Sequence, residues 1–217
     1  MAFPKTSHSA ILGLHDEDAT VRRHSMEAVI GAYWEPVRKY LRLRWRESPE
    51  DSADLTQAFF SRSIETGMFT HYDAAKGTFR TYLRTCLDHF VLNERRKVDA
   101  PAIPLDIDIA GPDDPPEEVF HREWVRSILT LAIDDLRAAQ DELRFRVFER
   151  HDLNDSGPAP SYAALAAEFG VTTASITNYL AAMRRELRKA VFHRLRELTV
   201  TDREFRSEAR AVLGIEV

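Results

Sequence analysis

Residues 162–189 read YAALAAEFGVTTASITNYLAAMRRELRK, and this stretch says most about the fold. Leu165 and Phe169 give a first helix one apolar face. Gly170 follows where the chain must turn sharply, because glycine enters left-handed backbone space without a Cβ penalty. Thr172 then suits the N-cap of a second helix. The stretch therefore predicts a helix-turn-helix.

The second helix of this pair has two contrasting faces. Apolar residues recur at spacings of four, three and four, which marks one buried stripe: Ile176, Leu180, Met183 and Leu187. The opposite face carries polar and basic residues: Thr173, Thr177, Asn178, Arg184, Arg185 and Arg188. Small polar groups precede arginines, as a helix in the major groove requires for base edges and then phosphates. A helical hairpin with a solvated basic face is the alternative interpretation.

Charge is segregated along the 217 residues, although the net charge is only −5. Residues 21–46 hold seven basic residues against two acidic ones, and residues 173–196 hold six against one. Residues 98–118 hold seven acidic residues and no basic one. Local patches matter more than the mean charge for nucleic-acid binding, so two regions of the chain are candidates for it.

Several classes of protein are disfavoured by composition and motifs. The single cysteine, Cys86, allows no disulfide framework and no cysteine zinc cluster, and suits a small core residue. No apolar run has transmembrane length and the N-terminus lacks a signal pattern, so we expect a cytoplasmic protein with no membrane partner. The chain has no H-E-x-x-H, G-x-S-x-G or phosphate-loop motif, and its histidines share no ligand spacing. We therefore expect no catalytic residue, no metal and no cofactor.

The segment 98–118 divides the chain, because it holds five of the ten prolines and has no helical periodicity. We predict an all-α fold of two small helical bundles joined by this proline-rich acidic linker, the second bundle containing the helix-turn-helix. The expected division is an N-terminal lead, a first bundle, the linker, a second bundle and a helical extension: 1–20, 21–97, 98–118, 119–198 and 199–217.

Periodicity and punctuation predict the individual helices. They are expected over residues 21–46, 51–66, 78–97, 117–139 and 141–151, with a kink or a late start at Pro36. The extension carries a capping box, Thr201-x-x-Glu204, and stops at Gly214. The positions expected to be buried are Trp34, Val37, Leu41, Trp45, Leu55, Phe59, Phe79, Leu83, Cys86 or Leu87, Phe90, Phe120, Trp124, Ile128 and Leu131.

Two blocks of the chain, in this order, resemble bacterial RNA polymerase sigma factors of the sigma-70 class, extracytoplasmic-function group. The first is DSADLTQAFF (51–60), a loop, and FRTYLRTCLDHFVLNERRK (79–97), which is similar to the family's D-A-E-D-L-x-Q and F-R-x-W-L patterns. The second is GVTTASITNYLAAMRRELRK (170–189). The resemblance covers roughly residues 21–198, and the residues from 199 onward have no counterpart in the two-domain pattern.

The resemblance implies a role for each block. The first domain docks on the polymerase clamp through the acidic motif, which Asp51, Asp54 and Gln57 match, and it recognises and melts the −10 element. The groups suited to capture an unstacked base there are Phe69, His71, Tyr72, Lys76, Arg80, Tyr82, Arg84 and His89. Arg95, Arg96 and Lys97 would follow the phosphate backbone. The second domain reads the −35 element.

Three of these assignments have equally plain alternatives. Tyr82 stands where the family has tryptophan, and core packing explains it as well. The run of Arg95, Arg96 and Lys97 also suits a solvated helix end, whose dipole favours cations. The acidic linker resembles the family's connector, which threads the polymerase's RNA path and can mimic nucleic acid, but a solvated tether has the same composition.

The departures from the family pattern concern charge. Ala53 replaces the motif's glutamate and Ala58 replaces the acid after the glutamine, so two carboxylates are missing. A phosphate would bring about −1.5 to −2 charges to that surface, which makes Ser52 and Thr56 candidate phosphorylation sites. Ser61 and Ser63 lie in the same neighbourhood. Compensation by Glu47 and Glu50 is the alternative.

The expected function is that of a sigma factor that directs promoter-specific transcription initiation. Its expected partners are core RNA polymerase, promoter DNA, and a Ser/Thr kinase or an anti-sigma factor. A free-standing helix-turn-helix regulator is the alternative, although the N-terminal block resembles neither a dimerisation nor a ligand domain. A sigma-like adaptor that sequesters a partner is a third class.

Overall fold

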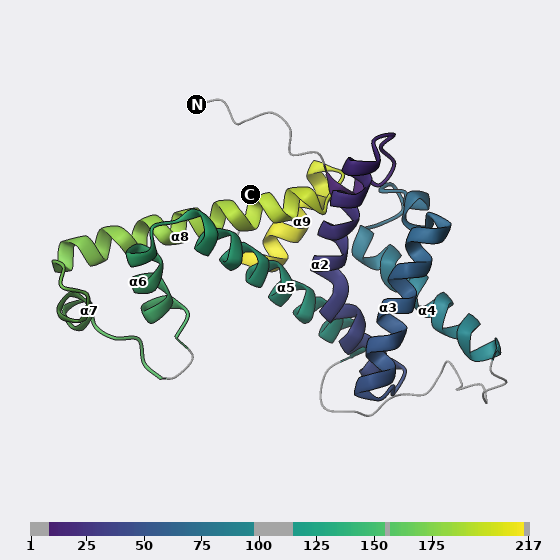
Figure 1. The fold of residues 1–217 in the computed structure, drawn as a ribbon, viewed down its shortest axis with the longest axis horizontal. Coiled ribbons are helices and arrows are strands. Elements are labelled where there is room, and N and C mark those ends of the chain that lie inside the picture. The colour runs from purple at the N-terminus through teal and green to yellow at the C-terminus, as the bar shows by residue number, and fades with distance from the viewer. Residues whose placement is uncertain (1–8, 98–114, 155–156, 215–217) are drawn as a thin grey trace. The chain divides into compact units, whose positions relative to one another are not determined.

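The computed structural model describes residues 9–97, 115–154 and 157–214, and in these ranges every regular element is a helix (Figure 1). The all-α fold class is therefore confirmed. The elements are α1 (Ala10–Gly13), α2 (Ala19–Arg44), α3 (Pro49–Thr66), the 3-10 helix η1 (Met68–His71), α4 (Phe79–Lys97), α5 (Pro116–Ala139), α6 (Glu142–Asp152), α7 (Tyr162–Phe169), α8 (Thr173–Glu197) and α9 (Asp202–Leu213). Most of the expected linker, residues 98–114, lies outside the described residues.

Local capping chemistry sets the helix ends close to where the sequence predicts them. The Ser48 hydroxyl accepts a hydrogen bond from the Asp51 N–H and starts α3, and Gly67 ends that helix with a left-handed φ of 60°. Asp18 caps α2 in the same way, so a late start at Pro36 is wrong and α2 runs through this proline. The Asp18 cap, and not the proline, therefore decides where α2 begins.

The chain forms two compact units whose limits differ from the expected ones. One unit combines Met1–Ile128 with Leu195–Val217, and the other is Leu129–Arg194. The boundaries therefore fall within α5 and α8 rather than in the proline-rich segment. The physical reason is burial, because Phe120 and Trp124 at the start of α5 stack on Tyr33 of α2 at 6.4 Å.

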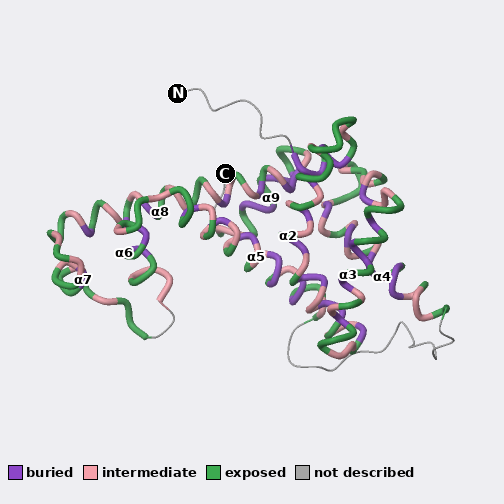
Figure 2. The backbone as a smooth tube through the Cα atoms, in the orientation of Figure 1, coloured by how far each residue is buried: buried purple, intermediate pink, exposed green. Residues whose placement is uncertain are grey.

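An aromatic core holds the first unit together, and its buried positions follow the inner sides of α2, α3 and α4 (Figure 2). The Phe59 ring of α3 meets the rings of Phe60, Phe69 and Phe90 at centroid distances of 5.3, 6.0 and 5.6 Å. Edge-to-face pairs of this kind contribute beyond the area that they bury. Phe59 is fully buried, so α3 and α4 depend on it for their packing.

Three expected core positions are only half-buried: Trp34, Leu55 and Leu131. Of the pair Cys86 or Leu87, Leu87 is the buried one. On α3 the inward positions next to Phe59 are instead taken by small hydroxyl residues, Ser52, Thr56 and Ser63. Each hydroxyl donates to a carbonyl of the same helix, which satisfies it without a partner elsewhere. A sequence pattern based on apolar residues alone misses such an inward face.

The C-terminal extension folds as expected into a short helix, α9, within the first unit. The Thr201 hydroxyl accepts from the Glu204 N–H at 3.1 Å, which confirms the N-cap half of the predicted capping box. Gly214 ends the helix with a φ of 65°. The side chains that α9 buries are Glu204, Phe205, Glu208 and Ala209.

Candidate nucleic-acid interface

The second unit contains the helix-turn-helix that its sequence predicts. Ser161 caps α7 by accepting from the Ala164 N–H, and Gly170 makes the turn with a φ of 65°. The Val171 N–H then reaches the Ala166 carbonyl at 3.0 Å, and the Thr172 hydroxyl caps α8 by accepting from the Ser175 N–H. The turn is thus closed by backbone geometry and two side-chain caps.

The turn can be tested with two glycine substitutions that differ in backbone conformation. Gly170→Ala should lower the free energy of unfolding by about 1–2 kcal/mol, because only the left-handed φ resists a Cβ there. Gly31→Ala, in the middle of α2 and equally open around a Cβ, should raise it by about 0.5–1 kcal/mol. Urea unfolding measures both, and changes of the same sign would contradict this account of the turn.

The predicted buried stripe of α8 is confirmed. Ile176, Leu180 and Met183 are fully buried, together with Leu165 of α7, and Leu187 is half-buried. They pack against Phe145, Val147 and Phe148 of α6 and Leu136 of α5. This core fixes the rotation of α8 about its axis, so the opposite face must point to solvent.

All six candidate reading residues of α8 are exposed: Thr173, Thr177, Asn178, Arg184, Arg185 and Arg188. These side chains differ in whether they are already hydrogen-bonded or paired within the chain. The Thr177 hydroxyl donates to the Thr173 carbonyl, and the Arg185 guanidinium lies 3.6 Å from Glu186. Within the described chain the side chains of Thr173, Asn178 and Arg188 have no hydrogen bond or ion pair, and Asn178 and Arg188 offer a ligand the most hydrogen-bonding groups.

Arg184 is held by a carboxylate of the same unit. Its Nε and one Nη each donate to Asp152 at 2.7 Å, and His151 contacts the same carboxylate at 2.6 Å. Burial opposes ionisation of Asp152, but these hydrogen bonds outweigh it and keep the pKa of Asp152 below its ordinary value. Asp152 in turn raises the pKa of Arg184. Arg184 therefore joins α8 to α6, and contact with a phosphate would have to compete with that bond.

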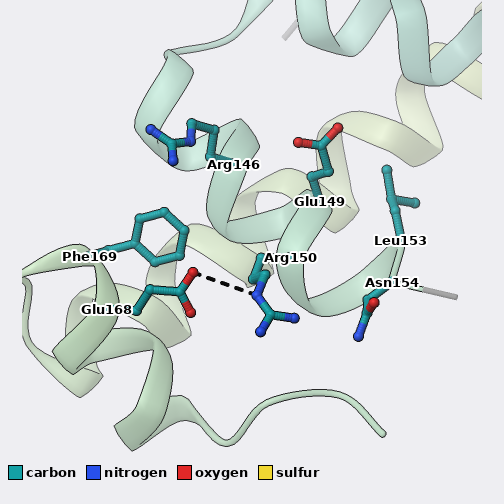
Figure 3. Close-up of a pocket in the computed structure, with 7 residues that line it drawn as sticks. All are labelled: Arg146, Glu149, Arg150, Leu153, Asn154, Glu168 and Phe169. Atoms are coloured by element: carbon teal, nitrogen blue, oxygen red, sulfur yellow. Dashed lines mark ion pairs between the residues drawn. The ribbon is translucent and has the colours of Figure 1, made fainter. Parts of the chain in front are cut away.

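A shallow pocket of about 480 Å³ lies between α6 and the end of α7 (Figure 3). Arg146 covers the Phe169 ring at 5.7 Å, and Arg150 forms a 3.5 Å ion pair with Glu168. Glu149 stands on the same wall, so positive and negative charges balance. The lining has no serine, cysteine or histidine, and we assign no chemistry to this pocket.

In the first unit the residues proposed for the −10 element do not form one exposed surface. His71, Lys76, His89, Arg96 and Lys97 are exposed. Phe69 is not available to a base, because it is 1% exposed and packs on Phe59, Phe60 and Phe79. Its assignment as a DNA-binding residue is wrong for this fold, since the left-handed turn at Gly67 directs the 3-10 helix into the core.

Tyr82 combines both interpretations offered for it. Its hydroxyl donates to the Met68 carbonyl at 2.7 Å and its ring lies 5.6 Å from Tyr72, so it packs on η1. Burial also raises the pKa of Tyr82, which keeps the phenol protonated. The ring nevertheless remains half-exposed on the same side of α4 as His89. Tyr82 is thus partly exposed while its hydroxyl is anchored to η1.

Three arginines proposed for DNA are engaged with acids of their own unit. Arg80 pairs with Glu208 of α9 at 3.3 Å, and its guanidinium lies 4.8 Å from the centre of the Trp124 ring and contacts His121. Arg84 lies 3.8 Å from Glu117. Arg95 pairs with Glu47 at 2.6 Å and lies over Trp45. Glu204 and Glu208 were not predicted as site residues, although their helical spacing with Phe205 and Ala209 marks an inward stripe.

The residues proposed for polymerase docking lie on the surface of the first unit. Asp51, Asp54 and Gln57 are all exposed on α3, and Ala58 is exposed as well. Asp51 also takes part in the helix cap, because the Ser48 hydroxyl donates to its carboxylate at 2.8 Å. The acid-poor motif therefore lies on a solvent-facing side of the helix.

The two candidate phosphorylation sites lie on the opposite, buried side of α3. Ser52 and Thr56 are fully buried, and their hydroxyls donate to the carbonyls of Pro49 and Ser52 at 2.9 and 2.6 Å. A phosphate cannot enter this face without separating α3 from its neighbours, so these two assignments conflict with the fold. Of the hydroxyl residues named with them, Ser61 is exposed and Ser63 is buried. Of these four hydroxyl residues, only Ser61 is exposed on the side of α3 that carries Gln57 and Ala58.

Among the described residues, no group of three or more histidine, cysteine or acidic side chains could hold a metal ion. None of the helices in the described ranges has both the length and the apolar character needed to cross a membrane. Comparisons with protein-family models, curated proteins and solved structures gave no match to this chain.

Proposed function

We propose that this chain is a bacterial sigma factor that binds core RNA polymerase and directs promoter-specific transcription initiation. One observation carries the proposal. The two motif blocks each present their functional side to solvent, the acidic motif on α3 and the polar face on α8, while the apolar side of each helix is buried. A helical hairpin with a solvated basic face would explain α8 alone, and it leaves the exposed acidic motif of α3 without a role.

In this proposal α8 reads the −35 element, with Asn178 at a base edge and Arg188 at phosphates. The exposed side of α4, with Tyr82 and His89, faces the −10 element, and Lys76, Arg96 and Lys97 contact phosphates. The α3 face with Asp51, Asp54 and Gln57 binds the basic clamp of the polymerase. Such a protein acts in the bacterial cytoplasm, where an anti-sigma factor or a kinase would act on the same surfaces.

Binding to polymerase is the first test. Purified core RNA polymerase and the full chain should co-elute in size-exclusion chromatography at micromolar concentration. Free protein should bind duplex DNA weakly, because its net charge is negative and its basic groups are divided between two units. Tight binding of the free protein to one duplex site, without any association with polymerase, would favour the free-standing regulator instead.

The missing carboxylate at Ala58 gives a specific prediction. Ala58→Glu should strengthen binding to core polymerase, because it adds an acid to the exposed face that carries Asp54. A single exposed pair contributes about 0.2–1 kcal/mol, or roughly 1.4- to 5-fold in affinity. Ala58→Gln has nearly the same size without the charge and should leave the affinity unchanged. Equal affinities for the two variants would show that this face does not meet a basic partner.

A further inference from the structure

The helix α9 has an unusual distribution of charge. Its arginines, Arg203, Arg206 and Arg210, face solvent, whereas Glu204 and Glu208 are 7% and 3% exposed. Acidic side chains are almost never buried so far unless they meet specific partners. Each glutamate has a partner at the start of α4, the Phe79 N–H for Glu204 and Arg80 for Glu208.

Glu204 binds the N-terminus of α4. One carboxylate oxygen accepts from the Phe79 N–H at 3.0 Å, and the other accepts from the Val200 N–H at 2.9 Å. The first oxygen also lies 3.1 Å from the Tyr72 hydroxyl, whose single hydrogen it shares with the Gly77 carbonyl at 2.8 Å. Unpaired N–H groups and the helix dipole favour an anion at this position. A carboxylate supplied by α9 thus takes the place that a phosphate oxygen would fit.

Glu208 binds the next residue of α4. It lies 3.3 Å from Arg80, and its Oε2 atom has no hydrogen-bond partner within the described residues. A buried charge with a single partner gains little free energy relative to the same charge hydrated in water. The contact is therefore specific, and separation of α9 would hydrate Glu208 and leave the Arg80 guanidinium with its contacts to Trp124 and His121.

Tyr72 and Arg80 belong to the set of groups that the resemblance to sigma factors offers for capture of an unstacked −10 base. We propose that α9 is an internal competitor of promoter DNA. Its two inward carboxylates occupy the phosphate positions at Tyr72, the Phe79 N–H and Arg80, and the free chain keeps this surface closed until α9 is displaced. This inference rests on the proposed function, but it concerns a contact that can be measured without polymerase.

A pair of charge-neutralising variants tests the competition. The probe is a fluorescein-labelled oligo(dT) of about 15 nucleotides, a length within the range of single-strand sites. Glu208→Gln should bind it at least about 5-fold more tightly than wild type, since the competing charge is lost. Asp202→Asn removes one charge from the same helix, but Asp202 is exposed and pairs with Arg196 at 2.5 Å, away from α4. It should change the affinity by less than about 2-fold.

Equal affinities for Glu208→Gln and Asp202→Asn would overturn the proposal, because net charge alone would then explain the change. Hydrogen exchange on the wild-type chain gives a second readout that needs no variant. Saturating oligo(dT) should speed exchange of the amides of α9, Phe205 to Ala209 included. Unchanged or slower exchange there would mean that DNA binds without displacing α9, and the proposal would fail.

These outcomes are separable from the proposed function. If polymerase binding fails while Glu208→Gln tightens single-strand binding and DNA exposes α9, the internal competitor stands and the sigma assignment falls. If polymerase binding succeeds while α9 stays protected with DNA bound, the sigma assignment stands and the competitor falls.

Discussion

Replacement of Phe59 by alanine should lower the free energy of unfolding by about 3–5 kcal/mol, the range for truncation of a buried phenylalanine. Phe59 is fully buried and its ring contacts Phe60, Phe69 and Phe90. The cavity would lie beneath α3, opposite the exposed acidic motif. Urea unfolding followed by tryptophan fluorescence and circular dichroism measures the loss, and polymerase binding should fall with it.

The matched control is Ile64→Ala on the same helix. Ile64 is 55% exposed, so its truncation should change the free energy of unfolding by less than about 0.5 kcal/mol. Similar losses for the two variants would mean that α3 is not packed through its Phe59 side. The predicted orientation of Asp51 and Asp54 would then lose its support.

Asn178→Ala should change which −35 sequences the protein selects, at a cost of about 1–3 kcal/mol for its preferred base. The side chain is exposed beside the buried stripe of α8 and has no bond within the described chain to replace. Arg188→Ala should instead weaken all sequences alike and lower the salt dependence by about one phosphate contact. Competition binding of the polymerase complex to a library of −35 variants at two salt concentrations separates the two effects.

Lys189→Ala is the control for Arg188, because it removes one positive charge from the neighbouring position. The Lys189 ammonium is already paired with Glu186 at 2.9 Å, so its loss should matter less than that of Arg188. A uniform loss across the library for Asn178→Ala would show that this residue does not read bases.

The helices that the sequence predicts best are those with both a periodic apolar face and a cap. For α8 the spacing of Ile176, Leu180 and Met183 gave the buried side, and Thr172 gave the first turn. Because the buried side fixes the exposed one, the exposed polar face of α8 also followed from the sequence. The same logic located the N-cap of α9 at Thr201 and its end at Gly214.

The polar residues that the sequence does not place correctly share a physical cause, which is that a polar side chain can face inward when its partners lie within the protein. Ser52 and Thr56 are inward because their hydroxyls bond to carbonyls of α3 itself. Glu204 and Glu208 are inward because they meet a helix N-terminus and an arginine from residues far away in the sequence. The periodicity of apolar residues predicts neither arrangement. The buried hydroxyl side of α3 and the contact of α9 with α4 could therefore be seen only in the structure.

The expected division of the chain failed for a related reason. Composition marked the proline-rich segment as a boundary, but the compact units are set by where α5 buries its aromatic residues. Phe120 and Trp124 pack on Tyr33 in the first unit, whereas Leu136 belongs to the core beneath the helix-turn-helix. A continuous helix can thus contribute to two cores, and a sequence boundary need not be a packing boundary.

Run-off transcription tests the central claim most directly. Core RNA polymerase, the full chain and fragments of the source genome are combined, and transcript start sites are mapped with and without the chain. The account predicts discrete starts that require the chain and that share two upstream elements, the farther of which changes in sequence preference with Asn178→Ala. Polymerase that neither binds the chain nor gains any start site from it would contradict the account.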